Sequence, residues 1–478
     1  MCGIALLCGE NAKEHMPLML NKLSHRGPDD MNIWANSRLA IGFVRLAIND
    51  ESIEGRVPHQ VEDWVSAFNG EIYNAEQLIR QYNLFLNSKN DTHVIAPLFS
   101  ILGNQILAEL DGFYAGILYQ SKTNSLYLLR DYIGKKPLFY GRSEGHVFVV
   151  SELKALKEID WFEQVPLGVS KLDLLTGKLT QITSHPQITD NKSSLEAAIE
   201  RAVLKRLPAQ PIGVFLSGGL DSSIVAALAH KHHQDVSYFV LGNAGSPDVK
   251  MAKKVIEHLG LQQVKYVSLP TKSELPSLIA KVIKATESFN PSIISNGLAT
   301  YLLAGAAHEE NLKVVLTGEG ADELFSGYHA FLPEVEWLPM RERLINDMHF
   351  TELRRLDTCS MAHSIEARCP FLDRAVKSIA DSIEYNNIYS NGQNKAILRD
   401  AFKHKLPIEI SERKKTSFDV GSGIRKLVVQ FLTRNGRKEI DELKVMWEQI
   451  FPFDADNGYF YRYPAFDDAI AKRTEVHR

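Results

Sequence analysis

Cysteine is scarce in this chain of 478 residues, which holds four cysteines, at positions 2, 8, 359 and 369. None of them belongs to a Cys-x-x-Cys pair, so the sequence argues against a disulfide framework and against a cysteine-ligated zinc site. Scarce, unpaired cysteine is typical of proteins from a reducing compartment, and we therefore expect a cytoplasmic protein.

Long apolar runs and long runs of one charge are also missing. No segment approaches the roughly 20 apolar residues that a membrane span needs. The apolar stretch at 4–7 is too short for the core of a signal peptide and has no basic segment before it. Lysine and arginine number 54 against 58 acidic residues, a formal net charge of −4. This balance predicts neither a nucleic-acid-binding surface nor a polybasic membrane patch.

The chain is too long for a single hydrophobic core, so two or three domains are expected. Up to about residue 160 it is rich in short segments of β-branched and aromatic residues. Segments 113–120 and 125–131 flank the polar tetrapeptide SKTN, which predicts a β-hairpin. We expect an antiparallel α+β domain here, followed by a linker at 184–194, where serine, asparagine, aspartate and proline are frequent.

From residue 195 onward, amphipathic helices alternate with apolar strands. The expected helices are 194–207, 221–233 and 246–260, and the expected strands are 211–216, 236–242, 262–269 and 313–318. Ser246 is predicted to cap the third of these helices, and Gly260 to follow its last turn. The alternation predicts a parallel, doubly wound α/β sheet, in which ligands bind at the C-terminal ends of the strands.

The segment VFLSGGLDSS (214–223) leads from one of these strands through two glycines into a helix. Glycines let backbone N–H groups approach an anion, and a helix N-terminus adds partial positive charge, so we expect phosphate binding here. The loop lacks the Gly-Lys-Ser/Thr ending of a kinase-type P-loop. Asp221 beside a phosphate implies an intervening cation, and Mg²⁺ fits that place. A simple glycine-rich turn with an aspartate helix cap is the alternative.

A second loop, LTGEGADELFSGY (316–328), follows another strand of the same predicted sheet. It brings Glu319, Asp322 and Glu323 to the same expected edge. Acidic residues are common caps at helix starts. Two glycine-rich, acid-bearing loops at one edge of a sheet nevertheless favour a nucleotide site.

Motifs along nearly the whole chain resemble those of the glutamine-dependent asparagine synthetases. They are CGI (2–4), SHRGPDD (24–30), RLAI (45–48), FNGEIYN (68–74), NDTHV (90–94), RDYIGKKPLFYG (130–141), SGGLDSS (217–223), TGEGADELFSGY (317–328), SMAHSIEARCPFLD (360–373) and KAILRDAF (395–402). The resemblance implies an N-terminal-nucleophile (αββα sandwich) class II glutaminase domain over 1–185. It further implies an α/β ATP-pyrophosphatase-type amide synthetase domain over 195–478.

For the first domain, the resemblance implies that removal of Met1 exposes Cys2 as a nucleophile with its own α-amino group as base. The thiolate would attack glutamine, giving a thioester and ammonia, with the Asn69 side chain and the Gly70 N–H as the oxyanion hole. The resemblance assigns the binding of the glutamine zwitterion to Arg45, Glu71 and Asp91. Each of these residues, taken alone, is also compatible with a surface ion pair.

For the second domain, the resemblance implies formation of an acyl-adenylate and pyrophosphate from ATP, followed by attack of ammonia to give an amide and AMP. It places Glu319 near the acceptor and Lys415 near the acyl-adenylate phosphate, and it assigns Mg²⁺ to Asp221 and Asp322. The implied ATP-binding residues are Leu216, Ser217, Gly218, Gly219, Asp221, Ser222, Ser223, Leu241, Thr317 and Gly318.

The segment 295–299 departs from the family. It reads Ser-Asn-Gly-Leu-Ala, where the aspartate-specific enzymes carry a stretch like Arg-Ala-Ser-Thr-Pro. A hydroxyl does not replace a guanidinium in binding a carboxylate. Either another residue supplies the charge for an aspartate acceptor, or the acceptor is a different carboxylate.

Two other readings stay open: a ligase of the β-lactam synthetase kind, and a non-enzymatic sensor that binds glutamine or nucleotide. The intact set around Cys2 counts against the first, because those relatives generally lose this cysteine. Retention of Asp221, Glu319, Asp322 and Lys415 counts against the second. The sequence is compatible with a homodimer, and it decides neither the oligomeric state nor whether free ammonia can replace glutamine.

Overall fold

The computed structural model describes residues 2–187, 193–328, 333–390 and 392–462. It divides into two compact units, Met1–Gln187 with Phe451–Asp454 and Ile188–Ile450 with Ala455–Arg478. Part of the predicted linker, 188–192, lies outside the described residues. No helix in the described part of the chain is long and apolar enough to span a bilayer.

The first unit contains two six-stranded sheets, and their strands pair in antiparallel fashion. The first has the order β10 (Trp161–Gln164), β8 (Phe139–Ser143), β9 (His146–Val150), β1 (Cys2–Cys8), β3 (Leu39–Arg45), β2 (Asp30–Ala35). The second has the order β12 (Leu179–Thr183), β11 (Gly168–Leu172), β7 (Ser125–Arg130), β6 (Gly112–Gln120), β5 (Trp64–Ile72), β4 (His59–Val61). The predicted antiparallel α+β arrangement is confirmed, and β6 with β7 forms the predicted hairpin.

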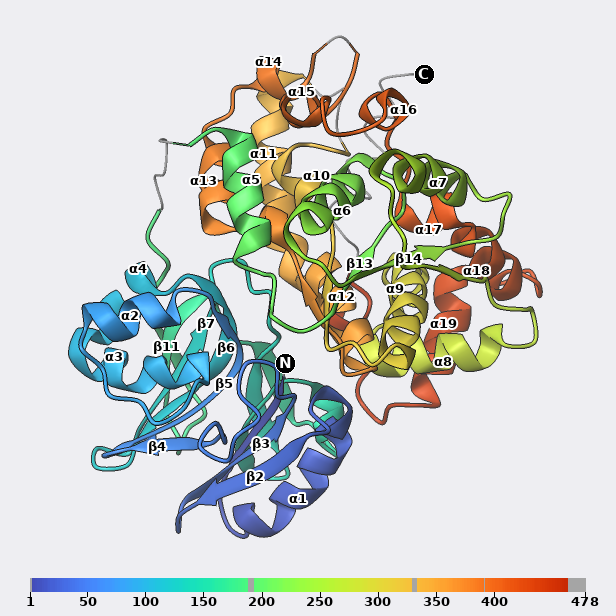
Figure 1. Cartoon of the computed structure of the whole chain (residues 1–478). Helices are drawn as coiled ribbons and strands as arrows, with labels where there is room; N and C mark the ends of the chain where they lie inside the picture. Colours follow the sequence, from blue (N-terminus) through green and yellow to red (C-terminus); the bar gives the residue numbers. More distant parts are fainter. Residues whose placement is uncertain (1, 188–192, 329–332, 391, 463–478) are drawn as a thin grey trace. The chain divides into compact units, whose positions relative to one another are not determined.

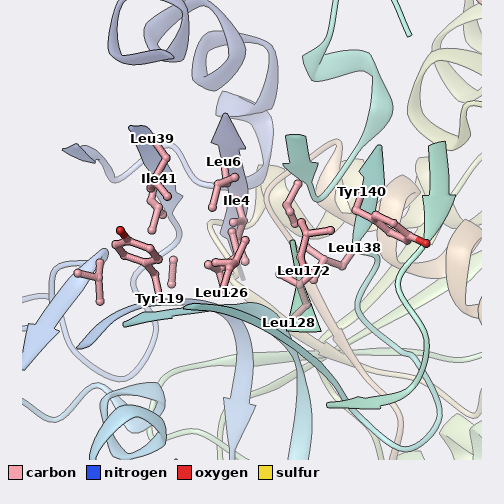
Figure 2. Close-up of a cluster of buried hydrophobic side chains, with 14 of the residues drawn as sticks. Ile4, Leu6, Leu39, Ile41, Tyr119, Leu126, Leu128, Leu138, Tyr140 and Leu172 are labelled. Carbon is pink, nitrogen blue, oxygen red and sulfur yellow. The ribbon is translucent and has the colours of Figure 1, made fainter. Parts of the chain in front are cut away.

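The core of this unit lies between the two sheets. Ile4 and Leu6 from β1 meet Leu126 and Leu128 from β7 within one cluster of fully buried side chains (Figure 2). Alternate residues of each strand supply this cluster, because side chains along a strand point to opposite faces in turn. The sheets are therefore held together by apolar burial at ~25 cal/mol per Å².

Helices cover the outer faces of the two sheets. Helix α1 (Ala12–Leu23) packs on β1 and β3, where a Cβ on Gly42 would lie 2.5 Å from the Met16 sulfur. Helices α2 (Ala75–Gln81), α3 (Ile95–Leu102) and α4 (Ile106–Glu109) belong to a second cluster that includes β5, β6 and β7 side chains. These helices anchor the strands whose ends form the first site.

The second unit contains a five-stranded parallel sheet in the order β15 (Val264–Val267), β14 (Val236–Leu241), β13 (Ile212–Phe215), β16 (Val314–Leu316), β17 (Glu366–Arg368). The predicted parallel sheet is confirmed, with the short strand β17 added to it. Figure 1 shows α6 (Leu220–His232) and α7 (Pro247–Leu259) on one side of β13 and β14, and α9 (Pro291–Glu309) on the other.

The remaining helices of the second unit surround this sheet. They are α5 (Leu195–Leu204), α8 (Leu275–Thr286), α10 (Ala321–Leu324), α11 (Glu334–Asp347), α12 (Glu352–Met361), α13 (Arg374–Asp381), α14 (Tyr385–Ile388), α15 (Ala396–Phe402), α16 (Ile408–Ser411), α17 (Phe418–Ser422), α18 (Ile424–Leu432) and α19 (Glu439–Glu448). Between β13 and β16 the strand order reverses direction along the chain. Such a reversal opens a crevice at the C-terminal ends of the two strands.

One predicted cap differs in the structure. Ser246 precedes α7 as expected, and Gly260 follows it with φ +67°, but the Ser246 side chain makes no capping hydrogen bond. Its hydroxyl instead donates to the carbonyl of Ser422 and accepts from the N–H of Asn243. The sequence could not show this, because Ser422 is 176 residues away.

Candidate active site

The first cluster begins at the amino end of β1, where the backbone nitrogen of Cys2 donates to Oδ1 of Asn69 over 2.9 Å. Asn69 is fully buried in β5, and its Nδ2 has no hydrogen-bond partner within the described part of the chain. The contact thus fixes the amide so that its unused N–H groups lie beside the cysteine. An unpaired buried donor costs free energy, and an oxyanion that accepts from it would relieve that cost.

Gly70 follows Asn69 in β5 and has φ +154°. A Cβ at this position would lie 2.1 Å from the carbonyl oxygen of Phe113 on the paired strand β6. The close approach of the two strands therefore requires glycine here. Gly70 places its backbone one residue from the Asn69 amide, as an oxyanion hole of these two residues would need.

Arg45 lies directly opposite Cys2 in the register of β1 and β3. Its guanidinium donates to the carbonyl oxygens of Ser52, over 3.1 Å, and of Asp50. The Asp50 carboxylate accepts instead from the N–H groups of Ser52 and Lys89, each over 2.8 Å. Within the described part of the chain no carboxylate forms an ion pair with Arg45, so its charge is available to an anion.

Two carboxylates stand near the end of β5. Asn49 Nδ2 donates to Glu71 over 2.7 Å and to Asp91 over 3.3 Å, and the second oxygen of Asp91 accepts from the N–H of Ile72 over 2.5 Å. Burial, and then the charge of Glu71, raise the pKa of Asp91 to about 8. Two carboxylates that repel each other in this way gain stability when a cation such as an ammonium group comes between them.

A buried network of ion pairs contacts the backbone of the candidate nucleophile, Cys2. Arg26 donates from Nε to the carbonyl of Cys2 over 2.9 Å and from Nη1 to Glu152 over 2.6 Å. Glu152 also pairs with Lys154 at 3.0 Å and with His25 at 2.9 Å. Burial would raise the pKa of Glu152, but these three cations outweigh it and hold the pKa well below its ordinary value. The network therefore fixes the backbone at Cys2.

The second cluster lies at the C-terminal ends of β13 and β16. In the loop before α6, the hydroxyl groups of Ser217 and Ser222 are 3.0 Å apart, and the N–H of Gly219 donates to Ser217 Oγ. Gly218 has φ +66°, and a Cβ there would lie 2.3 Å from the backbone nitrogen of Ala252. The loop is thus held tightly around the N-terminus of α6, which can accept an anion.

An ammonium group joins the two loops. Lys395 Nζ lies 2.7 Å from Asp221 and 2.6 Å from Asp322, and Lys415 Nζ contacts the other oxygen of Asp322. Burial would raise the pKa of Asp322, but the two lysines outweigh it and lower the pKa. The carboxylates of Asp221 and Asp322 therefore converge on one position that a cation occupies.

This convergence also tests the fit of Mg²⁺. Oδ1 of Asp221 is buried without a hydrogen-bond partner in the described part of the chain, whereas both oxygens of Asp322 contact lysines. Mg²⁺ in nucleotide sites is held by one or two carboxylates together with phosphate oxygens and water. The two aspartates fit that donor set. No group of three or more histidine, cysteine, aspartate or glutamate ligands occurs among the described residues, so the protein alone does not enclose a metal.

Glu319 belongs to a third group of charged side chains. Its Oε1 accepts from Arg355 over 2.7 Å, and nearby Glu323 accepts from the Tyr328 hydroxyl over 3.2 Å. Burial, and then the charges of Asp322 and Glu319, raise the pKa of Glu323 to about 8. Arg355 is thus the cation paired with Glu319 next to this acidic group.

These groups line one cavity of about 430 Å³ in the second unit. The predicted residues on its wall are Ser217, Gly219, Asp221, Ser222, Thr317, Gly318, Glu319, Asp322 and Lys415. Four further ATP-binding candidates do not line it: Leu216, Gly218, Ser223 and Leu241. Gly218 shapes the loop backbone, and the other three are buried in the packing behind it.

The chain matches the family models for the glutamine amidotransferase domain over residues 1–193 and for asparagine synthase over 194–347 and 336–451. The asparagine synthetase B [glutamine-hydrolyzing] of Escherichia coli is 32% identical over 84% of this chain and 78% of its own. That of Zea mays is 31% identical over 97% of this chain and 85% of its own. A probable asparagine synthetase of Acanthamoeba polyphaga mimivirus is 31% identical over 84% and 80%. The chain belongs to the asparagine synthetase family.

Several residues that contact the two candidate clusters were not singled out from the sequence. They are Arg26, Glu152, Arg355, Lys395 and Arg413, and of these Lys395 offered a local signal. It opens the motif KAILRDAF and has φ +54°, a left-handed conformation that a lysine adopts only where its surroundings hold it. Arg413 donates to the carbonyl of Ser217 and pairs with Asp248 at 2.5 Å, which ties the Lys415 segment to the phosphate loop.

The family departure at 295 also has a structural outcome. Ser295 is fully buried in α9, and its hydroxyl donates to Oδ2 of Asp419 over 2.7 Å. It does not line the cavity, whereas Ser292, Asn296 and Thr300 on the same helix do. The helix therefore presents neutral polar side chains to the cavity, and a carboxylate, that of Asp419, stands next to Ser295.

Proposed function

We propose that this protein is a glutamine-hydrolysing, ATP-dependent amide synthetase that converts aspartate to asparagine. The observation that carries the proposal is the Asn69 amide, locked by the backbone of Cys2 with its N–H groups unused beside the candidate nucleophile. The relatives named above are asparagine synthetases that hydrolyse glutamine and align with most of this chain, which supports the same activity here.

In the glutaminase step, Met1 is removed and the α-amino group of Cys2 takes the proton of the thiol. The thiolate attacks the side-chain amide carbon of glutamine while Asn69 Nδ2 and the Gly70 N–H hold the oxyanion. Collapse expels ammonia and leaves a thioester, which water hydrolyses to glutamate. Arg45 binds the substrate carboxylate, and the carboxylates at the end of β5 bind its ammonium group.

In the synthetase step, the acceptor carboxylate attacks the α-phosphate of ATP and displaces pyrophosphate. The glycine-rich loop from Ser217 to Ser223 and the N-terminus of α6 hold the phosphates. Lys415 stabilises negative charge on the acyl-adenylate phosphate. Ammonia then attacks the acyl carbon, AMP leaves, and the amide forms.

Asp221 and Asp322 would hold Mg²⁺, which when bound would neutralise phosphate charge. Lys395, which bridges these carboxylates at 2.7 and 2.6 Å, supplies positive charge to the same position. Glu319, held by Arg355, stands on the cavity wall, where it can accept a proton from the attacking nitrogen.

We assign the N-terminal-nucleophile αββα class to the first domain, at 1–185, and the ATP-pyrophosphatase class to the second, at 195–478. The two antiparallel sheets with helices outside them support the first assignment. The parallel sheet with the glycine-rich loop after β13 supports the second. A cytoplasmic setting agrees with the four free cysteines.

The test is an assay with purified full-length protein, ATP, Mg²⁺, glutamine and aspartate. We expect glutamate, pyrophosphate, AMP and asparagine in equal amounts. Release of pyrophosphate with another carboxylate but not with aspartate would overturn the acceptor assignment and keep the mechanism. Absence of both pyrophosphate and glutamate release would overturn the proposed function.

A further inference from the structure

The wall of the synthetase cavity formed by α9 and α17 contains one unusual charge. Asp419, in the first turn of α17, lines the cavity and is 5% exposed. Its side chain accepts one hydrogen bond, from Ser295, and within the described part of the chain it forms no ion pair. A buried carboxylate without a cation is costly unless a ligand supplies the positive charge.

Most cationic side chains of the cavity already contact other groups of the protein. Lys395 and Lys415 pair with Asp322. Three arginines pair with carboxylates: Arg355 with Glu319, Arg413 with Asp248, and Arg425 with both oxygens of Glu439. Arg399 instead donates to Asn394 and to the carbonyl oxygens of Ser411 and Arg413. Lys414 remains, and it is exposed to solvent. In the described part of this cavity Arg399 is thus the guanidinium without a carboxylate partner, and its donors are directed to protein oxygens.

The neighbouring face of α9 adds no charge. Ser292, Asn296 and Thr300 follow one another at helical spacing along the cavity wall, and all three are neutral. Asp419 is thus the charged group of this wall, and it is negative. The Ser295 hydroxyl donates to the Asp419 carboxylate and so fixes the position of that side chain.

We infer that Asp419 binds the amino group of the acceptor, so that this enzyme recognises its acceptor as a 3-aminocarboxylic acid through the ammonium rather than through a second carboxylate. The inference rests on the proposed function: ATP itself has no cationic group, its Mg²⁺ is assigned to Asp221 and Asp322, and the acceptor must then bring the cation for Asp419. Aspartate satisfies the requirement with its α-ammonium. Ser295 acts as a positioning residue for Asp419.

Two analogues of aspartate separate the two modes of recognition. β-Alanine keeps the amino group and lacks the α-carboxylate, whereas succinate keeps both carboxylates and lacks the amino group. The full-length protein is supplied with ATP, Mg²⁺ and ammonium chloride, so that the glutaminase step is bypassed, and pyrophosphate release is measured. Each analogue is tested as a substrate and as a competitive inhibitor against aspartate, so that its affinity is obtained even without turnover.

We expect β-alanine to bind on the order of 10- to 100-fold more tightly than succinate, the range for a hydrogen bond to a charged group. Asp419→Asn keeps the acceptor atom for Ser295 and removes the charge. It should raise the KM for aspartate by a similar factor and abolish the preference for β-alanine. Ser295→Ala should raise that KM by a smaller factor and leave kcat nearly unchanged.

The matched control is Asp235→Asn, the same charge change at an exposed residue before the amino end of β14, away from the ligand edge. It should leave every constant unchanged. Succinate binding as tightly as β-alanine, or an unchanged KM in Asp419→Asn, would overturn the inference while the proposed function stands. If the unmodified protein releases pyrophosphate with none of the three acids, the proposed function fails and the inference fails with it.

Discussion

The two candidate sites differ in how their charges are arranged before any ligand binds. In the first unit the donors are left open: Asn69 Nδ2 has no partner, and Arg45 contacts only carbonyl oxygens among the described residues. In the second unit the charges neutralise one another, as Lys395 does with Asp221 and Asp322. One site is preorganised for its substrate, and the other must exchange internal ion pairs for ligand contacts.

This difference in charge pairing follows from the elements that carry the residues of each site. In the first site Asn69, Gly70 and Glu71 are consecutive residues of one strand, and Cys2 faces Arg45 across a regular register. Strand geometry positions them, and the contact of Arg26 with the Cys2 carbonyl supports it. In the second site the groups come from loops after β13 and β16 and from segments far along the chain, so ion pairs between side chains fix their positions. Polyanionic ATP with Mg²⁺ can re-pair such charges, because both partners bring compensating charge.

The largest expected effect separates the two sites outright. Cys2→Ala should lower glutamine-dependent synthesis by about 10⁴-fold or more, the usual cost of removing a nucleophile, because no thioester can form. Synthesis with ammonium chloride should persist. Both rates are measured as asparagine formed. Cys8→Ala is the control, since the Cys8 thiol donates to the carbonyl of Leu174 at 3.6 Å and packs against the core between the sheets; equal loss in both variants would contradict the nucleophile assignment.

The converse change acts on the second site. Asp322→Asn should lower pyrophosphate release by about 10²-fold or more, since metal-assisted charge stabilisation supplies several kcal/mol. Glutamine hydrolysis should be preserved. Asp400→Asn serves as the matched control, because that carboxylate forms an exposed pair with Lys403. A normal rate of pyrophosphate release in Asp322→Asn would remove the reason to place Mg²⁺ there.

A smaller change tests the preorganisation of the first site. Asn69→Ala should lower kcat for glutamine hydrolysis by about 10²–10³-fold, as removal of one oxyanion donor does, and change KM little. The ammonia-dependent rate should be unaffected. Steady-state glutamate release gives both constants. A main effect on KM would mean that Asn69 binds glutamine and does not stabilise the oxyanion.

The smallest effect concerns stability next to the glutaminase site. The rings of His59 and His93 stack 3.7 Å apart, and His93 contacts the Arg56 carbonyl and the Ser88 hydroxyl. Burial lowers the pKa of both, that of His93 to about 3, with the charge of His59 next in importance for His93. Below pH ~6.5 the unfolded chain binds protons that the folded chain does not, so stability falls as the pH drops toward 3.

We expect the free energy of unfolding to fall by about 1–2 kcal/mol from this source between pH 7 and pH 5. His59→Phe keeps an aromatic ring and cannot titrate, and the His59 Nδ1 has no hydrogen-bond partner in the described part of the chain to lose. It should flatten the pH dependence of urea unfolding. An unchanged slope in this variant would show that other groups dominate acid unfolding.

Local patterns predicted the strands and loops that carry most of the candidate site. The segment 64–74 is predicted as strand-like because it is rich in β-branched and aromatic residues, and it contains β5, while the glycines at 218–219 indicate a tight turn before a helix. The supporting contacts could not be predicted in this way. Arg26 and Glu152 are 126 residues apart, and Lys395 and Asp221 are 174 apart. Pairing at such distances depends on how the elements pack, which local propensity does not encode.

The sequence by itself determined the family and the order of the two units, and it nominated the residues proposed to do the chemistry, because motifs of fixed spacing can be recognised without a structure. Tertiary structure decided which of those residues have free donors and which are already paired. It turned Ser295 away from the cavity and placed Asp419, 124 residues later, on the cavity wall. The physical reason is that charge in a cavity is set by all the elements that surround it, so the recognition of the acceptor depends on the packing of α9 against α17.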